Sequence, residues 1–272
     1  MKTANKQSGR TLAEMTVVIA AIVLLGSFGL PAIRTFLDSF ETGTGARPVI
    51  SAALASARAI AAKEQRYAGI RFQKAYNPDA PLEPLKEDQY MVFIIQDPNI
   101  GAYFFRAVEG LEPIKLPDSI GVMDYELINQ AIMSVPTWEP SSNHPVDLID
   151  LTTFSIIFSP SGKMVIHDVR VRNRDGQSHT SATLSYDDVF NTTLQVDAGV
   201  GMFYQDDYYP GYASTPNLGL GPEPSRRAFV MYDRREFKIA YDKGRAYSDY
   251  LSKLIPNEVI QINPYTGTMV EK

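Results

Sequence analysis

The stretch SGRTLAEMTVVIAAIVLLGSFGLPAI, from Ser8 to Ile33, is the only long apolar run in the chain, and it carries a carboxylate, Glu14, near its start. No charged residue follows between Met15 and Ile33. A helix over those residues would be roughly 28 Å long, which matches the thickness of the hydrocarbon core of a bilayer. The stretch therefore predicts a single membrane-spanning helix.

The charges on either side of this segment predict its orientation. Three basic residues and no acid precede Glu14, whereas Arg34 is soon followed by Asp38 and Glu41. Because basic residues stay on the cytoplasmic side, the N-terminus is expected in the cytoplasm and everything after Phe36 outside the inner membrane. No small-residue cleavage motif follows the apolar core, which favours a segment that is retained.

An acid at the edge of such a helix has two interpretations. A charged side chain at the centre of a bilayer costs about 2.5–3.5 kcal/mol on insertion scales, and it normally has a partner. Glu14 could extend to the cytoplasmic headgroups, since it lies at the edge of the segment. Alternatively, a neighbouring chain supplies the cation that Glu14 needs.

The residues around Glu14 complete a wider pattern. Gly9 precedes a Thr-Leu pair, the acid and the apolar run, and Pro31 lies near the end of that run. This set resembles the N-terminus of type IV pilins and of the pseudopilins of type II secretion. The resemblance implies that residues 1–9 are a leader, that prepilin peptidase cuts between Gly9 and Arg10, and that the new terminus on Arg10 is methylated. The first mature residue of that family is usually Phe or Met, so Arg10 is a departure.

The resemblance also implies assembly roles for two residues. The new amine on Arg10 of one subunit would pair with Glu14 of its neighbour, as a charge-assisted pair in a region of low dielectric constant. Pro31 would loosen the helix, because proline removes a backbone donor and collides with the preceding turn. A simple kink at the end of the span is the alternative for Pro31.

Four segments follow from these observations. Residues 1–9 are the expected leader, 10–41 the transmembrane and assembly helix, 42–48 a hinge with two glycines and Pro48, and 49–272 a periplasmic or extracellular head. Many pilins have one unbroken helix here, so the hinge is a second departure.

The head is predicted to be an α+β domain, with an antiparallel sheet packed on a helix. Val49 to Arg66 is Ala-rich with apolar residues at helical spacing, and three strands, predicted from aromatic and β-branched content, form a meander after it. The later expected elements are a hairpin and a further strand, then a helix and a terminal turn. The strands of the meander are Tyr67–Phe72, Gln89–Gln96 and Ala102–Val108. The hairpin joins Phe154–Phe158 to Lys163–Arg172 through the turn Ser159–Gly162. The further strand is 227–233, the later helix is Asp242–Leu254 and the terminal turn is Asn263–Gly267. This order is loosely similar to H-type minor pseudopilins.

The composition argues against several kinds of chemistry. The chain has 272 residues, no cysteine and a net charge of −5 with scattered Lys and Arg, so disulfides and thiolate sites are excluded and nucleic acid is not expected as a partner. His144, His167 and His179 show no metal-ligand spacing. The SPSG sequence around Ser161 is interpreted as a turn, not as a nucleophile elbow.

The stretch 198–225 is rich in Gly, Pro, Tyr and Asp and predicts a long surface loop. Asp206 and Asp207, beside Tyr204 and Tyr208, could contribute to a calcium site, but a solvated loop tip is the favoured interpretation. The tyrosines could bind glycan or another subunit, while a loop that only shields the sheet is the simpler alternative.

These observations predict a structural subunit that is not an enzyme and needs no cofactor. Its expected partners are other pilin or pseudopilin subunits, prepilin peptidase, the inner-membrane assembly platform with its ATPase, and membrane lipid. The expected location is the bacterial inner membrane, followed by a filament in which this chain is a minor subunit. Secretion, DNA uptake, adhesion and motility remain alternatives for the filament. A signal-anchored periplasmic binding protein or enzyme is the alternative for the chain as a whole.

Overall fold

The computed structural model describes residues 45–271, apart from residues 78, 81–82, 141–144, 175–186, 188, 193–194, 197 and 207–221. The helices in these ranges are α2 (Ala46–Glu64), α3 (Tyr125–Ser134), α4 (Pro145–Thr152), α6 (Arg234–Asp242), the π-helix η1 (Ala246–Leu251) and α7 (Ser252–Glu258). The strands are β1 (Ala68–Lys74), β2 (Gln89–Gln96), β3 (Phe104–Ala107), β4 (Ile114–Lys115), β5 (Ile120–Asp124), β6 (Phe154–Phe158), β7 (Met164–Val165), β8 (Asp168–Val171), β9 (Phe190–Asn191), β10 (Phe203–Tyr204), β11 (Glu223–Pro224), β12 (Ala228–Asp233), β13 (Val259–Ile262) and β14 (Met269–Glu271).

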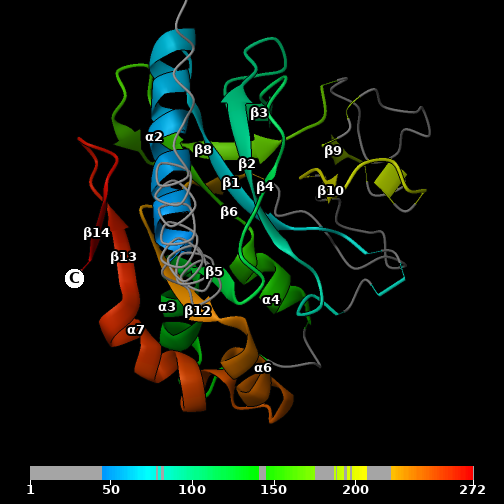
Figure 1. The fold of residues 1–272 in the computed structure, drawn as a ribbon, viewed down its shortest axis with the longest axis vertical. Helices are drawn as coiled ribbons and strands as arrows, with labels where there is room; N and C mark the ends of the chain where they lie inside the picture. Colours follow the sequence, from blue (N-terminus) through cyan, green and yellow to red (C-terminus); the bar gives the residue numbers. More distant parts are fainter. Residues whose placement is uncertain are drawn as a thin grey trace, which may run out of the picture.

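The strands form two main sheets, which confirms the predicted α+β class. The large sheet has eight strands in the order β11-β8-β3-β2-β1-β6-β7, with β4 paired to β2. The small sheet has four strands in the order β14-β13-β12-β5 and is antiparallel throughout. Figure 1 shows α2 alongside the strands of the large sheet, the β13–β14 hairpin on its other side, and α6 and α7 at one end of the molecule.

The prediction of a purely antiparallel sheet is wrong at one pairing. Strand β3 pairs with β8 in parallel, with Phe104 opposite Arg170 and Phe105 opposite Val171. The predicted return strand of the hairpin, Lys163–Arg172, is in fact two strands, because only β7 pairs with β6. After Val165 the chain leaves the hairpin, and β8 joins the sheet beside β3 instead.

Helix α2 follows from its sequence, and it begins three residues earlier than the predicted Val49. Its first residue is Ala46, so Pro48 lies in the first turn, where a missing backbone donor is tolerated. Its buried residues recur at helical spacing, and most of them are alanines, which brings the helix close to β1, β2 and β6. The C-terminal part of the predicted 42–48 hinge is therefore helical, while residues 42–44 lie outside the described ranges.

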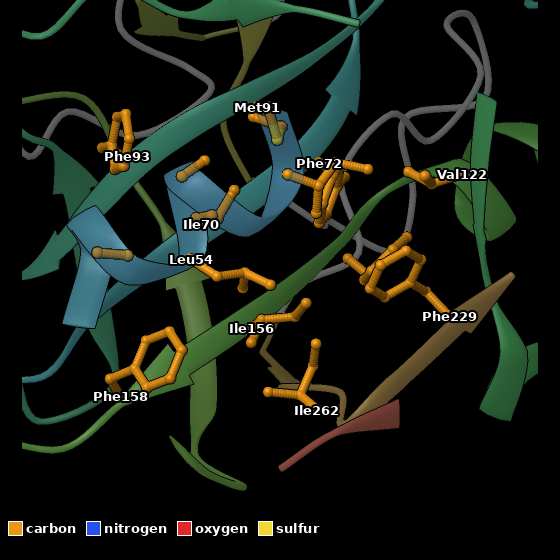
Figure 2. Close-up of a cluster of buried hydrophobic side chains, with 14 of the residues drawn as sticks. Leu54, Ile70, Phe72, Met91, Phe93, Val122, Ile156, Phe158, Phe229 and Ile262 are labelled. Atoms are coloured by element: carbon orange, nitrogen blue, oxygen red, sulfur yellow. The ribbon is translucent and has the colours of Figure 1, made fainter. Parts of the chain in front are cut away.

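The main core lies between α2 and both sheets. Figure 2 shows Leu54 of α2 facing Ile70 of β1 and Ile156 of β6, with Phe229 of β12 and Ile262 of β13 closing the cluster from the small sheet. Phe72 stacks against Phe154 with ring centroids 4.9 Å apart. One hydrophobic cluster thus holds the helix and the two sheets together.

The remaining faces are covered as well. Val189, Phe190 and Phe203 cover the opposite face of the large sheet, where they pack on β2, β3 and β8. Helices α3, α4, α6, η1 and α7 cover the other face of the small sheet around Tyr232 and Phe237. Because both faces of the central strand β1 are covered, all seven of its residues are buried.

The other predicted elements agree to different degrees. The meander β1-β2-β3, strand β12 and the β13–β14 hairpin are confirmed. The helix predicted over Asp242–Leu254 is found with later bounds, since α6 ends at Asp242 and the next helical residues run from Ala246 to Glu258. Helices α3, α4 and α6 were not predicted.

Candidate functional site

The residues predicted to carry processing and assembly all precede the first described residue, Gly45. Gly9, Arg10, Glu14 and Pro31 therefore lie outside the described part of the chain. None of the helices in the described ranges combines the length and the apolar character needed to cross a bilayer.

The histidines and Ser161 form no catalytic arrangement where they are described. His144 and His179 lie outside the described ranges, and His167 lies between β7 and β8 with its ring centroid 4.4 Å from that of Tyr67. Ser161 is exposed in the β6–β7 turn, where its Oγ lies 2.9 Å from Ser159 Oγ, so the turn interpretation is confirmed. The described residues contain no group of three or more His, Cys, Asp or Glu that could hold a metal ion.

Asp206 is not at a solvated loop tip. It is fully buried, and its Oδ1 accepts a hydrogen bond from Arg71 Nη2 at 2.6 Å. Its Oδ2 accepts a second bond from the backbone N–H of Val171 at 2.8 Å. Both carboxylate oxygens are therefore satisfied by protein groups, which overturns the solvated interpretation. Asp207 and Tyr208, the other half of the predicted cluster, lie outside the described ranges.

Asp206 belongs to a buried network of five charged side chains. Arg71 Nη1 lies 3.4 Å from Glu223 Oε1, and Glu223 Oε2 lies 3.5 Å from Arg226 Nη2. Arg226 Nε in turn donates to Asp124 Oδ2. The network joins β1 to the stretch after β10, to β11 and to the end of β5, so it connects the large sheet to the small one.

The geometry of the network singles out Glu223. Two arginines face three acids, and the short contacts pair Arg71 with Asp206 and Arg226 with Asp124. Among the described residues, Glu223 has just the two longer contacts, so it is the acid left over. Burial, aided by the charges of Asp206 and Asp124 and opposed by the two arginines, raises the pKa of Glu223 to about 8. With Glu223 protonated at neutral pH, the buried charges balance.

Sequence patterns did not identify this network. The alternation of Gly69, Arg71 and Gln73 with apolar residues is typical of a strand with one solvent-facing side. In the structure that side is buried, and Gln73 Oε1 accepts a bond from Arg71 Nε at 2.7 Å. Tyr204 and Asp206 lie over this side and make it an interior one, and alternation does not encode their position.

A groove of about 410 Å³ runs along the exposed side of α2. Arg58 of α2 forms hydrogen bonds to two other segments that line the groove. Its Nε donates to Gly162 O and its Nη1 donates to Thr266 O, each at 2.7 Å. Arg58 is the one ionisable side chain among the lining residues, which are Ser51, Ala55, Arg58, Ala59, Ala62, Ser161, Gly162, Thr266, Gly267 and Thr268. Small side chains and backbone groups dominate the surface, so the groove suits contact with another surface better than acid–base catalysis.

Comparison of the chain with protein-family models, with curated proteins and with solved structures finds no match.

Proposed function

We propose that this chain is a pilin-like structural subunit, a pseudopilin, that inserts in the bacterial inner membrane and joins a type II secretion pseudopilus or a type IV pilus-like filament as a minor subunit. The observation that carries the proposal is the set of Gly9, Glu14 and Pro31 around one apolar run in the sequence. Each element alone is common, but their spacing together is specific to that N-terminal pattern.

The proposed mechanism is assembly through the N-terminal segment. Cleavage by prepilin peptidase after Gly9 frees the amine of Arg10, which pairs with Glu14 of a neighbouring subunit. Each charge is costly alone in a low-dielectric environment, so pairing favours the assembled state. Because the amine and the acid are offset along one chain, pairing between chains favours an axial stagger and an open helical filament.

The head is consistent with this role. A helix packed along a sheet is the arrangement that the resemblance implies, and α2 begins at Ala46, within the predicted hinge that follows the membrane segment. The head is also tied together across its layers by the main core and by the buried charge network. A rigid head on a membrane helix suits a part that is moved as a unit by an assembly platform and its ATPase.

Substitution of Glu14 tests the proposal. In native membranes that contain the assembly machinery, Glu14→Leu should leave the protein inserted but abolish its crosslinks to other pilin-like subunits, because the amine of the neighbour loses its partner. Glu109→Leu is the matched control, since the Glu109 side chain is 78% exposed in the head. Crosslinking followed by immunoblotting measures both variants against the native chain.

Two results would contradict the proposal. One is an intact mass that retains Met1 to Gly9 in a host with active prepilin peptidase, because the mature chain is expected to begin at Arg10. The other is crosslinking of Glu14→Leu at the level of the Glu109→Leu control. Together they would favour the signal-anchored binding protein or enzyme instead.

A further inference from the structure

Lys74, the last residue of β1, is a buried amine with little to hold its charge. Its side chain lies in the interior, with the whole residue only 4% exposed. Nζ donates one hydrogen bond, to the backbone oxygen of Glu87 at 3.0 Å, and it forms no ion pair with any residue in the described ranges. An ammonium group has three donors and is costly to bury without an anionic partner, so this environment disfavours the protonated form.

A positive charge lies beside the amine. Arg234 Nη2 donates to the same Glu87 backbone oxygen at 2.8 Å, which places a guanidinium next to the amine. Burial, and then the charge of Arg234, lower the pKa of Lys74 to about 7, against opposing contributions from Asp88 and Glu87. A large fraction of the Lys74 side chains is therefore unprotonated, and hence nucleophilic, near neutral pH.

The neighbouring acids are already engaged. Asp88 lies 3.3 Å from Arg234 Nη1 and 2.7 Å from Lys115 Nζ. Glu87 Oε1 accepts a bond from Asn77 Nδ2 at 2.8 Å. Neither acid therefore neutralises Lys74 by direct contact, and the positive potential of Arg234 at the amine favours a neutral or negative group at that position.

A small cavity adjoins the amine. Its volume is about 20 Å³, and its lining includes Lys74, Asn77, Glu87, Ile149 and Tyr204. A space of that size accepts about one water-sized molecule. Acyl donors and aldehyde cofactors are far too large for it, so size restricts any reaction partner of Lys74 to the smallest electrophiles.

We propose that Lys74 is a carbamylation site, whose amine reacts with carbon dioxide. The unprotonated Nζ attacks the carbon atom, one C=O electron pair moves onto oxygen, and a proton leaves Nζ for water, so that amine and carbon dioxide give a carbamate and one proton. No oxidant, reductant or other reactant is needed. The product carries a negative charge beside Arg234, so the guanidinium gains an anionic partner in place of a neutral amine. The inference is independent of the proposed filament function.

The direct test is chemical trapping in the full-length chain. The protein is purified in detergent, equilibrated with ¹³C-labelled carbon dioxide near neutral pH, ethylated with a trialkyloxonium salt and analysed by peptide mass spectrometry. A ¹³C-labelled ethyl carbamate is expected on Lys74 and not on Lys86 or Lys115, which are exposed. Absence of the label from the Lys74 peptide at saturating carbon dioxide would overturn the proposal, and this measurement needs no variant that must fold.

A variant pair tests the role of the guanidinium. Near pH 7, Arg234→Gln should lower carbamate occupancy by about fivefold if removal of the positive charge restores one unit to the pKa of Lys74. Arg235→Gln is the matched control, because Arg235 is the next residue of α6 and is exposed. Thermal melting verifies that both variants fold. Equal occupancy in the two folded variants would refute the assignment of Arg234 as the partner of the carbamate.

Discussion

At the scale of single residues, the buried charges of this head are arranged so that one acid keeps its proton. Arg71 and Arg226 each have a close carboxylate partner, and Glu223 lies between them at longer distances. A buried ion pair contributes little net stability, but removal of one partner is strongly destabilising because the remaining charge is left uncompensated. A protonated Glu223 avoids that situation, since it adds a hydrogen-bond donor and no charge.

This arrangement predicts a pH dependence of stability. The pKa of Glu223 is near 8 in the folded chain and 4.5 ordinarily, so the folded state holds a proton that the unfolded state releases between those values. The contribution of this group to stability is therefore complete below pH 4.5 and is lost as the pH rises through about 8. Its slope is up to about 1.4 kcal/mol per pH unit.

Glu223→Gln should remove this slope, because glutamine imitates the protonated acid at every pH. Urea denaturation of both proteins across that pH range measures the free energy of unfolding, and the difference between the curves isolates Glu223. Glu109→Gln, at an exposed site, should follow the native curve. Parallel curves for the native chain and Glu223→Gln would show that the buried acid is ionised.

At the scale of elements, α2 depends on small side chains at its buried positions. Ala53, Ala57 and Ala61 are at most 3% exposed and lie on the side that faces the large sheet. Alanine favours a helix and also leaves room for the strand side chains that fill the core around Leu54. The backbone of α2 therefore lies close to the large sheet, and a larger side chain at these positions would have no space.

Ala57→Leu should destabilise the head by about 1–3 kcal/mol, because an inserted side chain forces the helix away from the sheet. Ala52→Leu makes the same change on the exposed side of α2 and should stay within about 0.5 kcal/mol of the native chain. Chemical denaturation of both variants gives the comparison. An equal loss in both would mean that the effect comes from the leucine itself and not from packing.

Sequence patterns predicted an element well where neighbouring residues alone determine it. The apolar run of β2 was located with its observed ends, and the Asn263–Gly267 turn joins β13 to β14 as expected. Helix α6 was missed although it carries a local signal, since Asp233 caps it through bonds to the N–H groups of Arg235 and Glu236. A polar residue at the end of the β12 strand could have been recognised as that cap.

The pairing of strands was harder to predict than their positions. Alternation indicates that Lys163–Arg172 is extended, but not that the chain leaves its hairpin partner after Val165 and continues as β8 beside β3. The candidate sites depend on such contacts. Arg71 meets Asp206 and Lys74 meets Arg234 across more than a hundred residues of sequence, so no spacing motif connects them.

At the scale of the whole molecule, one side chain links the two sheets. Gln89 Nε2 donates to Val122 O at 3.0 Å and to Thr152 O at 2.8 Å, while its Oε1 accepts from Val122 N at 2.8 Å. A single buried amide therefore connects β2 of the large sheet to β5 of the small sheet and to the C-terminus of α4.

Gln89→Leu should destabilise the head by about 2–5 kcal/mol, because several buried backbone groups lose their partners at once. Gln261→Leu, at an exposed position of β13, is the control and should have little effect. Thermal and urea unfolding monitored in parallel measure the loss. A native-like Gln89→Leu would show that the main core and the charge network join the sheets without this amide.

The order of strands in the two sheets also has a consequence for the time course of folding. Strand β5 pairs with β12, and β1 pairs with β6, so the central contacts of both sheets join segments far apart in sequence. Loop-closure entropy must be lost before such contacts form, which makes chains of this kind slow to fold. The small sheet lacks β12 until the ribosome has added Asp233. Most of the head must therefore be synthesised before its layers can close, and until then its unpaired strand edges are prone to aggregation.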